Sequence, residues 1–298
     1  MYVDVFGKEY VKFTKSKTQR VNGNTSNHTV HCAKYDTFFK TQITLENIRY
    51  GIMLPGTYFY PFYFDLPLDV PPSCEWTHGN QRASISYTMK AAVHLSSVMS
   101  RNVSIESPLL VLYSNNIPSP PLPYVFKTIR VYKMCCFYKG DCHATIKLDQ
   151  GEYAPGDNIT ITSTFRNTSS VSVSYATCTL YRTIQLRANS SQTVNCSIME
   201  EQSFSTEDLH SELQEHLQHM ILSSRNNFPT MSRTLFTCTY SMRIKYTLSS
   251  TSNSVKVDLP VRIVPRNCLP EVIIECIPIQ FEESCSNVVT PSAPKLAL

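Results

Sequence analysis

Residues 54–67, LPGTYFYPFYFDLP, decide the class of fold. The Pro-Gly pair favours a turn, because proline presets one turn angle and glycine accepts a positive one. The aromatic residues that follow favour a strand, and the Leu-Pro at the end stops it. Nothing in the stretch has helical spacing. It therefore predicts an aromatic strand that belongs to a β-sandwich.

A strictly alternating strand is expected next, over residues 85–95. Its apolar residues fall on one face and mostly polar residues on the other, which is typical of a half-buried strand. The same pattern recurs at residues 3–13, 159–165, 242–248 and 255–263. A Ser/Thr/Asn turn separates the last two segments, so they predict a closing hairpin. We therefore expect an all-β protein.

A proline-rich stretch divides the chain, with four prolines in residues 117–123. Such a stretch is an extended and stiff spacer. We expect two consecutive immunoglobulin-like β-sandwich domains on either side of it. The expected parts are an N-terminal sandwich at 1–117, a linker at 118–124, a C-terminal sandwich at 125–281 and a disordered Ser/Pro-rich tail at 282–298.

One segment breaks the β pattern. Residues 205–222 begin with a Ser and Asp capping pattern, and their leucine, methionine and isoleucine residues recur at helical spacing. This pattern predicts a short amphipathic helix inserted in the C-terminal sandwich, with its apolar face packed on that domain.

Composition limits the classes of function. A chain of 298 residues, 42% of them hydrophobic, can bury a core in one or two domains. A net charge of +4 is too small to indicate a nucleic-acid partner. The N-terminus has no signal-peptide pattern, and the apolar runs are too short to cross a bilayer. We therefore expect a cytosolic protein whose 11 cysteines are mostly reduced.

No motif in the sequence predicts catalysis, a metal or a cofactor. Cys135, Cys136, Cys142 and His143 are close together, but adjacent residues of a strand point to opposite faces, which disfavours a zinc site. The sequence contains no nucleophile elbow, P-loop or dinucleotide fingerprint. We therefore expect a protein that is not an enzyme and needs no cofactor.

The densest basic run lies on the first expected strand. It consists of Lys8, Lys12, Lys15, Lys17 and Arg20. One interpretation is a solvated edge, since lysine on edge strands deters aggregation. The other is a surface that contacts acidic phospholipid or a phosphorylated cargo tail.

These motifs resemble those of the arrestin family. Residues 55–67 and the Ile-x-Tyr-x-x-x-Ala pattern at 85–91 are similar to its N-terminal domain. Gly-Glu-Tyr-Ala-Pro-Gly at 151–156 and Arg-Asn-Thr-Ser-Ser at 166–170 resemble the opening of its C-terminal domain. The resemblance covers roughly residues 5–265. The preceding pair Cys135-Cys136 is more typical of the α-arrestin, or arrestin-domain-containing, branch.

The resemblance implies a cytoplasmic, non-enzymatic adaptor in endocytosis, intracellular trafficking or ubiquitin-linked sorting of membrane proteins. Its partners would be cytosolic regions of receptors or transporters and the trafficking machinery, with peripheral association at the plasma membrane or endosomes. Family N-domains begin about forty residues earlier, so the first N-domain strands are expected to be missing. The sequence has no Pro-Pro-x-Tyr motif for WW-domain ligases, since residues 120–124 have one residue too many.

Two alternatives stay open at this point. One is the retromer-subunit type of arrestin fold, which is a coat component. The other is a secreted, disulfide-bonded binding module, for which seven Asn-x-Ser/Thr sequons and 11 cysteines are the support.

Overall fold

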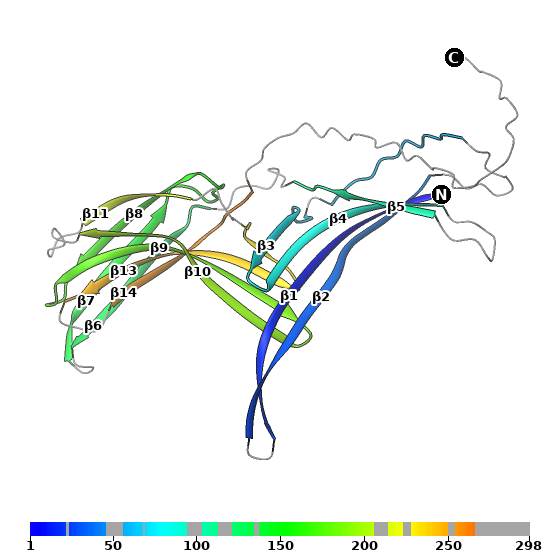
Figure 1. Cartoon of the computed structure of the whole chain (residues 1–298). Coiled ribbons are helices and arrows are strands. Elements are labelled where there is room, and N and C mark those ends of the chain that lie inside the picture. The colour runs from blue at the N-terminus through cyan, green and yellow to red at the C-terminus, as the bar shows by residue number, and fades with distance from the viewer. Residues whose placement is uncertain are drawn as a thin grey trace, which may run out of the picture.

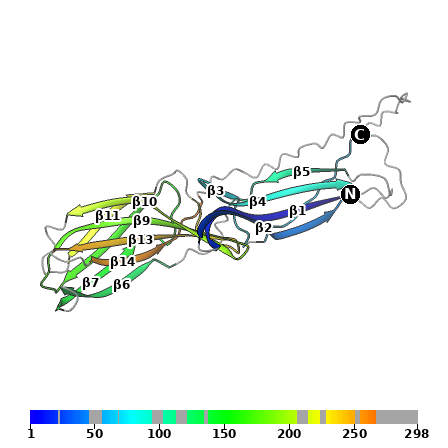
Figure 2. The same ribbon diagram turned by 60° about the horizontal axis from the view of Figure 1, so that its bottom comes forward.

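The computed structural model describes most of both domains. It covers residues 1–21, 24–45, 56–67, 69–93, 103–112, 121–133, 137–205, 214–222, 228–249 and 254–265, with the backbone alone at 19–21, 24–27, 205 and 214–216. The regular elements within these ranges are all β-strands, and none of these ranges holds a helix that could cross a membrane. Figures 1 and 2 show two lobes arranged end to end.

The N-terminal domain is built on a five-stranded antiparallel sheet. Its strands are β1 (Tyr2–Val21), β2 (Asn24–Thr44), β3 (Cys74–His78), β4 (Gln81–Val93) and β5 (Val103–Leu109). The order is β2-β1-β4-β3, and β5 also pairs with β4. Strict alternation along β1 buries Val3, Val5, Val11 and Phe13 on one face. That face forms the core side of the sheet.

The hairpin of β1 and β2 is longer than the rest of the sheet. β1 pairs with β4 only between Tyr2 and Lys12, whereas its pairing with β2 continues to Val21. Beyond Lys12 the two strands therefore continue as a two-stranded ribbon. The ribbon projects below the molecule in Figure 1.

The C-terminal domain is a sandwich of two antiparallel sheets. One contains β6 (Tyr124–Lys133), β7 (Phe137–Leu148), β8 (Asn158–Asn167) and β11 (Gln214–Ile221), in the order β11-β8-β7-β6. The other contains β9 (Val173–Ala188), β10 (Ser191–Ser205), β12 (Met231–Ser232), β13 (Phe236–Leu248) and β14 (Ser254–Val261), in the order β10-β9-β13-β12 with β14 on β13. Phe165 of the first sheet stacks on Tyr246 of the second, with ring centroids 4.0 Å apart. The predicted all-β fold of two sandwich domains and the predicted closing hairpin are confirmed.

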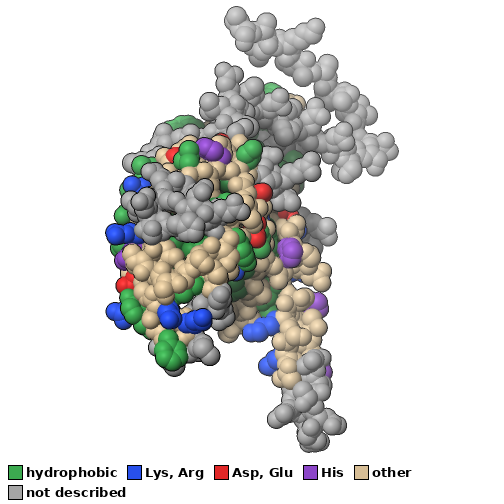
Figure 3. Space-filling view, turned by 90° about the vertical axis from the view of Figure 1, so that its left-hand side faces the viewer, with side chains coloured by type: hydrophobic (Ala, Val, Ile, Leu, Met, Phe, Trp, Pro, Cys, Tyr) green, Lys and Arg blue, Asp and Glu red, His purple; other side chains and the backbone are tan. Residues whose placement is uncertain are grey.

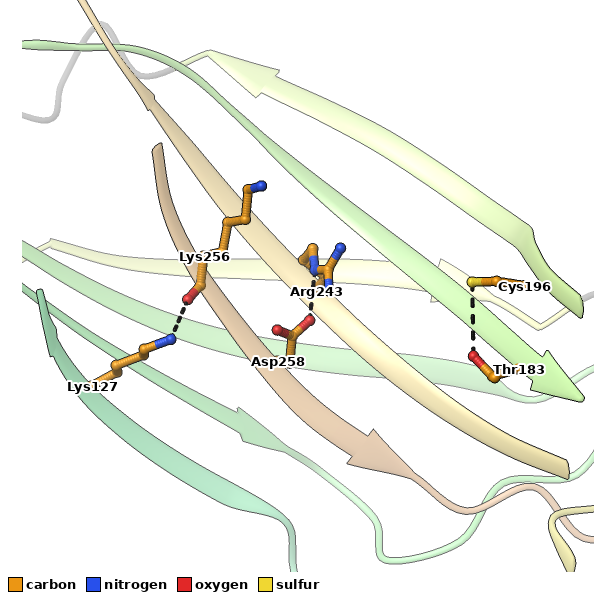
Figure 4. A network of polar contacts seen from close by, with 6 residues as sticks. All are labelled: Lys127, Thr183, Cys196, Arg243, Lys256 and Asp258. Carbon is orange, nitrogen blue, oxygen red and sulfur yellow. Dashed lines mark hydrogen bonds and ion pairs between the residues drawn. The ribbon is translucent and has the colours of Figure 1, made fainter. Parts of the chain in front are cut away.

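Polar contacts fasten strands of the sandwich to one another (Figure 4). The Lys127 ammonium donates to the carbonyl oxygen of Lys256 at 3.0 Å, which links β6 of one sheet to β14 of the other. Arg243 Nε donates to Asp258 Oδ1 at 2.6 Å across β13 and β14. These contacts lie on the outside of the domain, so each one adds little to stability by itself.

The Pro-Gly motif of the C-terminal domain forms the expected tight turn. The amide of Asp157 donates to the carbonyl oxygen of Ala154 at 3.0 Å, and Gly156 has a φ of 89°. These are the features of a type II turn, in which proline and glycine occupy the two central positions. The turn directs the chain into β8.

The tyrosine of the same motif anchors that turn to the end of β14. Tyr153 is buried, and its hydroxyl donates to Asp149 Oδ1 at 2.6 Å. Its amide donates to the carbonyl oxygen of Arg262, and its own carbonyl oxygen accepts from the amide of Val264. The tyrosine therefore joins the connection between β7 and β8 to the segment that follows β14.

The predicted helix at 205–222 is wrong where the structure describes it. Residues 214–221 form β11, which pairs antiparallel with β8. Met220 and Leu222 are buried, whereas Leu217 and Ile221 are exposed, as the two faces of an edge strand require. The open edge of β8 supplies hydrogen-bond partners that outweigh the helical spacing of the apolar residues. Residues 206–213 lie outside the described residues.

The predicted aromatic strand is also wrong. Residues 57–67 have no regular secondary structure. Phe59 and Tyr63 are 77% and 90% exposed, while Leu66 packs against the core. Pro61 interrupts the stretch and has no amide to donate to a neighbouring strand. The expected linker lies partly, and the expected tail wholly, outside the described residues, so the domain boundaries stay predictions.

We predict that Gly140→Ala destabilises the protein by about 2 kcal/mol. Gly140 has a φ of 120°, and an added Cβ would lie 2.6 Å from Ser169 Cα and 2.7 Å from the carbonyl oxygen of Thr168. Both obstacles are backbone atoms, so no rotamer change relieves them. Gly79→Ala is the control, because Gly79 also has a positive φ but has open space around it. Equal losses of melting temperature in the two variants would show that contact with the backbone of Thr168 and Ser169 is not the cause.

Candidate functional site at the domain junction

The C-terminal domain reaches the N-terminal domain through the hairpin of β9 and β10. Ala188 pairs with Ser191, which leaves Asn189 and Ser190 as the turn. Their φ values of 48° and 64° are both positive, as a type I′ turn requires, and asparagine tolerates this region better than most residues. β9 contacts both β1 and β2, and the turn lies close to β1 in Figure 1.

A buried ion pair joins the two domains beside this hairpin. Glu9 projects from the core face of β1 and has no exposed surface. Arg233, in the segment between β12 and β13, places its Nε 3.8 Å from Glu9 Oε2. Its guanidinium also lies over the ring of Phe38, 4.5 Å from the centroid. The cation is therefore shared between a carboxylate and an aromatic face.

The surroundings of Glu9 favour its neutral form. Burial raises the pKa of this carboxyl above its ordinary value of 4.5, and nearby Asp36 raises it further. The backbone of Leu235, the Arg233 cation and the Thr234 side chain oppose this rise without cancelling it. Neither Glu9 oxygen has a hydrogen-bond partner of normal geometry in the described part of the chain. The attraction of Arg233 therefore offsets only part of the cost of burying the charged Glu9 carboxylate.

We predict that this carboxyl makes stability depend on pH. A raised pKa means that the folded protein holds the proton more tightly than the unfolded chain does. The resulting stabilisation is fully present below pH 4.5, the ordinary pKa of the carboxyl. It disappears as the pH rises through the raised pKa of the folded state. Chemical unfolding at a series of pH values should show this component in the wild-type protein and lose it in Glu9→Gln. A pH profile unchanged by Glu9→Gln would contradict the assignment.

A glycine allows the aromatic support of Arg233 to form. Phe38 and Tyr87 meet edge to face, with ring centroids 5.7 Å apart. A Cβ on Gly7 would lie 2.8 Å from atoms of both rings. The Tyr87 hydroxyl donates to the carbonyl oxygen of Pro71 at 2.5 Å, which fixes the second ring. Because Gly7 has no Cβ, the two rings can pack directly against the backbone of β1.

A basic cavity of about 470 Å³ lies next to the ion pair. The N-terminal domain contributes Lys15 and Lys34 to it. The C-terminal domain contributes Arg187, the Asn189–Ser190 turn and Thr234. None of the described residues that line this cavity is acidic. The cavity is therefore a candidate anion site formed by both domains.

Arg187 is held in place by three hydrogen bonds. Its Nη2 donates to Gln185 Oε1 at 2.7 Å, and its Nη1 donates to the carbonyl oxygen of Arg233 at 3.4 Å. Its amide donates to the carbonyl oxygen of Leu235 at 2.7 Å. The partners of the two guanidinium bonds are neutral, so these bonds orient the guanidinium without neutralising its charge.

The structure divides the five predicted contact residues between two faces. Lys8 lies over the Phe6 ring at 5.1 Å and shares the solvent face of β1 with Lys12. Lys15 lines the cavity, and Lys17 follows on the same side of the ribbon. The side chain of Arg20 lies outside the described residues. Figure 3 shows basic side chains in blue beside the ribbon.

Four residues of the junction were missed at the sequence level. They are Glu9, Lys34, Arg187 and Arg233. Only Glu9 has a local signal, because it occupies a core-facing position of an otherwise apolar strand face. The others meet through contacts between distant segments, which no spacing rule detects.

Of the residues considered for zinc, the structure describes Cys142 and His143, which lie on opposite faces of β7. Cys142 is buried, its thiol donates to Asn167 Oδ1 at 3.2 Å, and burial raises its pKa to about 11. His143 points to the other face and stacks on Phe126. Cys135 and Cys136 lie outside the described residues. The described residues contain no group of three or more ligating side chains that could hold a metal ion, and their six cysteines are free.

Two sandwich domains that meet at a shared, charged junction define a two-domain β-sandwich protein. Residues 1–113 match the family model described as Arrestin (or S-antigen), N-terminal domain, and residues 139–268 match Arrestin (or S-antigen), C-terminal domain. The chain belongs to the arrestin family. A comparison with curated proteins gives no match.

Proposed function

We propose that this protein is a non-enzymatic arrestin-like adaptor in endocytosis and intracellular trafficking of membrane proteins. The observation that carries the proposal is the presence of both arrestin domains in their usual order. Its site of action would be the cytoplasmic side of the plasma membrane or of endosomes. Its partners would be cytosolic regions of receptors or transporters, together with trafficking machinery.

The motif Cys135-Cys136 supports placement in the α-arrestin branch, within this proposal. A role in ubiquitin-linked sorting would then need a route other than a Pro-Pro-x-Tyr motif, which the sequence does not contain. The β1 strand of the β1–β2 hairpin is the proposed contact surface for acidic cargo segments or lipid. The residues assigned to this contact are Lys8, Lys12, Lys15, Lys17 and Arg20.

The proposal is tested by removing the protein from cells and measuring the lifetime of membrane proteins at the cell surface. We expect a defined subset to be internalised more slowly and to accumulate. The wild-type chain should restore internalisation, whereas Lys8→Gln/Lys12→Gln/Lys17→Gln should restore it less well. Unchanged surface lifetimes across all membrane proteins would contradict the adaptor proposal. Full rescue by the triple variant would contradict only the assignment of the contact surface.

A further inference from the structure

We propose that two copies of this chain associate through the free edge of β10, so that the two sheets that contain β10 join into one continuous antiparallel sheet. The partner is a second copy because this edge is complementary to itself, both in its side chains and in its charges. The proposal does not depend on the adaptor role, because the purified chain can associate whether or not it sorts membrane proteins.

β10 is an edge strand with a long regular stretch. It pairs with β9 along one side, and no other strand of the described residues pairs with it. The pairing is regular from Ser191 to Ile198, and Met199 then forms a bulge. Alternate residues of such an edge direct their N–H and C=O groups away from the sheet. The stretch before the bulge is therefore a template for a further strand.

The side chains of this stretch do not protect the edge. Exposed edge strands commonly carry lysine or proline, which prevent pairing with another chain. Residues 191–199 contain neither, and none of them is charged. Val194 and Ile198 are 57% and 56% exposed, and the exposed Cys196 lies between them on the same face. By contrast β2, an edge strand of the N-terminal sheet, carries two lysines and an aspartate.

A two-fold axis at Asn195 gives the register that uses this stretch best. Opposite residues of antiparallel strands share a face of the sheet, so only residues of matching faces can lie opposite each other. With Asn195 on the axis, Val194 lies opposite Cys196 of the partner subunit. Gln192 then lies opposite Ile198 of the partner subunit. The apolar rows of the two copies cover one another, and pairing ends before the bulge.

The two ends of β10 carry opposite charges, which favours antiparallel pairing. Glu200 and Glu201 follow the bulge, and Glu201 is exposed. At the hairpin end, Gln192 lies opposite Arg187 of β9. None of these three charged residues forms an ion pair within the described part of the chain. The two-fold pairing brings the acidic end of each copy toward the basic end of the other, whereas parallel pairing would place like charges together.

The interface is small, because it consists of one strand pair and one row of apolar side chains. Such contacts belong to the weak, transient class of interfaces. We therefore expect a dissociation constant on the order of 10 µM. Association should depend strongly on protein concentration.

The first experiment is sedimentation velocity of the full chain from about 1 to about 200 µM, a range that brackets the expected constant. We compare the wild-type protein with Val194→Lys/Ile198→Lys, which places lysines of both copies side by side. The matched control is Leu217→Lys/Ile221→Lys, because these residues are equally spaced and exposed on β11, an edge strand of the other sheet. The β10 variant should associate at least about tenfold more weakly, and the control should stay within about twofold of the wild type.

Crosslinking tests the register. With Asn195 on the axis, the two Cys196 residues of a dimer are diagonal neighbours, about 7–8 Å apart. A bis-maleimide of that reach should therefore join two chains through Cys196, as peptide mapping can show. Cys196→Ser should remove this crosslink, and Val194→Lys/Ile198→Lys should reduce it in proportion to the loss of dimer.

Two outcomes would overturn the proposal. One is a wild-type protein that stays monomeric at about 200 µM, which would mean that this edge does not pair with a second copy. The other is a dimer that the control variant weakens as much as the β10 variant, or that crosslinks without Cys196. Thermal melts at low concentration check the fold of each monomer. Val194 and Ile198 are exposed, so their replacement should leave the melting temperature nearly unchanged.

Discussion

Replacing Arg233 with methionine should lower the free energy of unfolding by about 3 kcal/mol. Glu9 would then be a fully buried carboxylate without its cation. Removing one partner of a buried ion pair is costly because the remaining charge keeps its desolvation penalty. The Arg233 side chain is 24% exposed and 3.8 Å from Glu9, which places the loss at the low end of the usual range.

A double-mutant cycle tests the origin of this loss. Glu9→Gln/Arg233→Met removes both charges, and it should recover most of the stability that Arg233→Met alone loses. Chemical unfolding at about pH 8 should show a larger deficit for Arg233→Met than unfolding at about pH 5, because protonation of Glu9 relieves the buried charge. If the double variant is as unstable as the single variant, the loss comes from packing on Phe38 instead.

Phe165→Ala should cost about 4 kcal/mol, the largest effect that we expect from one substitution. Phe165 is buried between the two sheets of the C-terminal sandwich, and its ring stacks on Tyr246 at 4.0 Å. The ring of Phe204 also meets Tyr246 edge to face, so the cavity left behind cannot collapse easily.

Thr164→Ala is the control for this substitution. Thr164 precedes Phe165 in β8 and points to the other side of the sheet, so its replacement leaves the core intact. We expect a change of less than about 0.5 kcal/mol. A loss below about 1 kcal/mol for Phe165→Ala would show that the two sheets are not packed as the structure has them.

Strict alternation was enough to predict the strands that face the core. The segments at 3–13, 242–248 and 255–263 fall within, or largely overlap, β1, β13 and β14. The period of two reports burial directly, because one face of each strand is apolar. The stretch at 54–67 was informative for a different reason. It identified the family, although its described residues form no strand.

The errors came from segments whose structure depends on a neighbour. Leu213, Leu217 and Met220 are spaced as in a helix, yet the open edge of β8 converts residues 214–221 into a strand. The sequence pattern of residues 214–221 contains no information about the open edge of β8, because that edge exists only in the folded domain. The same limit applies to the junction, where Lys34 and Arg187 come from different domains and only the folded chain brings them together.

The ribbon formed by β1 and β2 beyond Lys12 has an energetic consequence. A two-stranded hairpin without a third strand is marginally stable in water. Opening of this segment should therefore cost less than opening of the sheet around Val5, and its amides should exchange with solvent sooner. Lys15 lies on this less stable ribbon, whereas Arg187 lies on β9, an inner strand of its sheet. We therefore expect backbone amides on the Lys15 side of the junction cavity to exchange with solvent sooner than those on the Arg187 side.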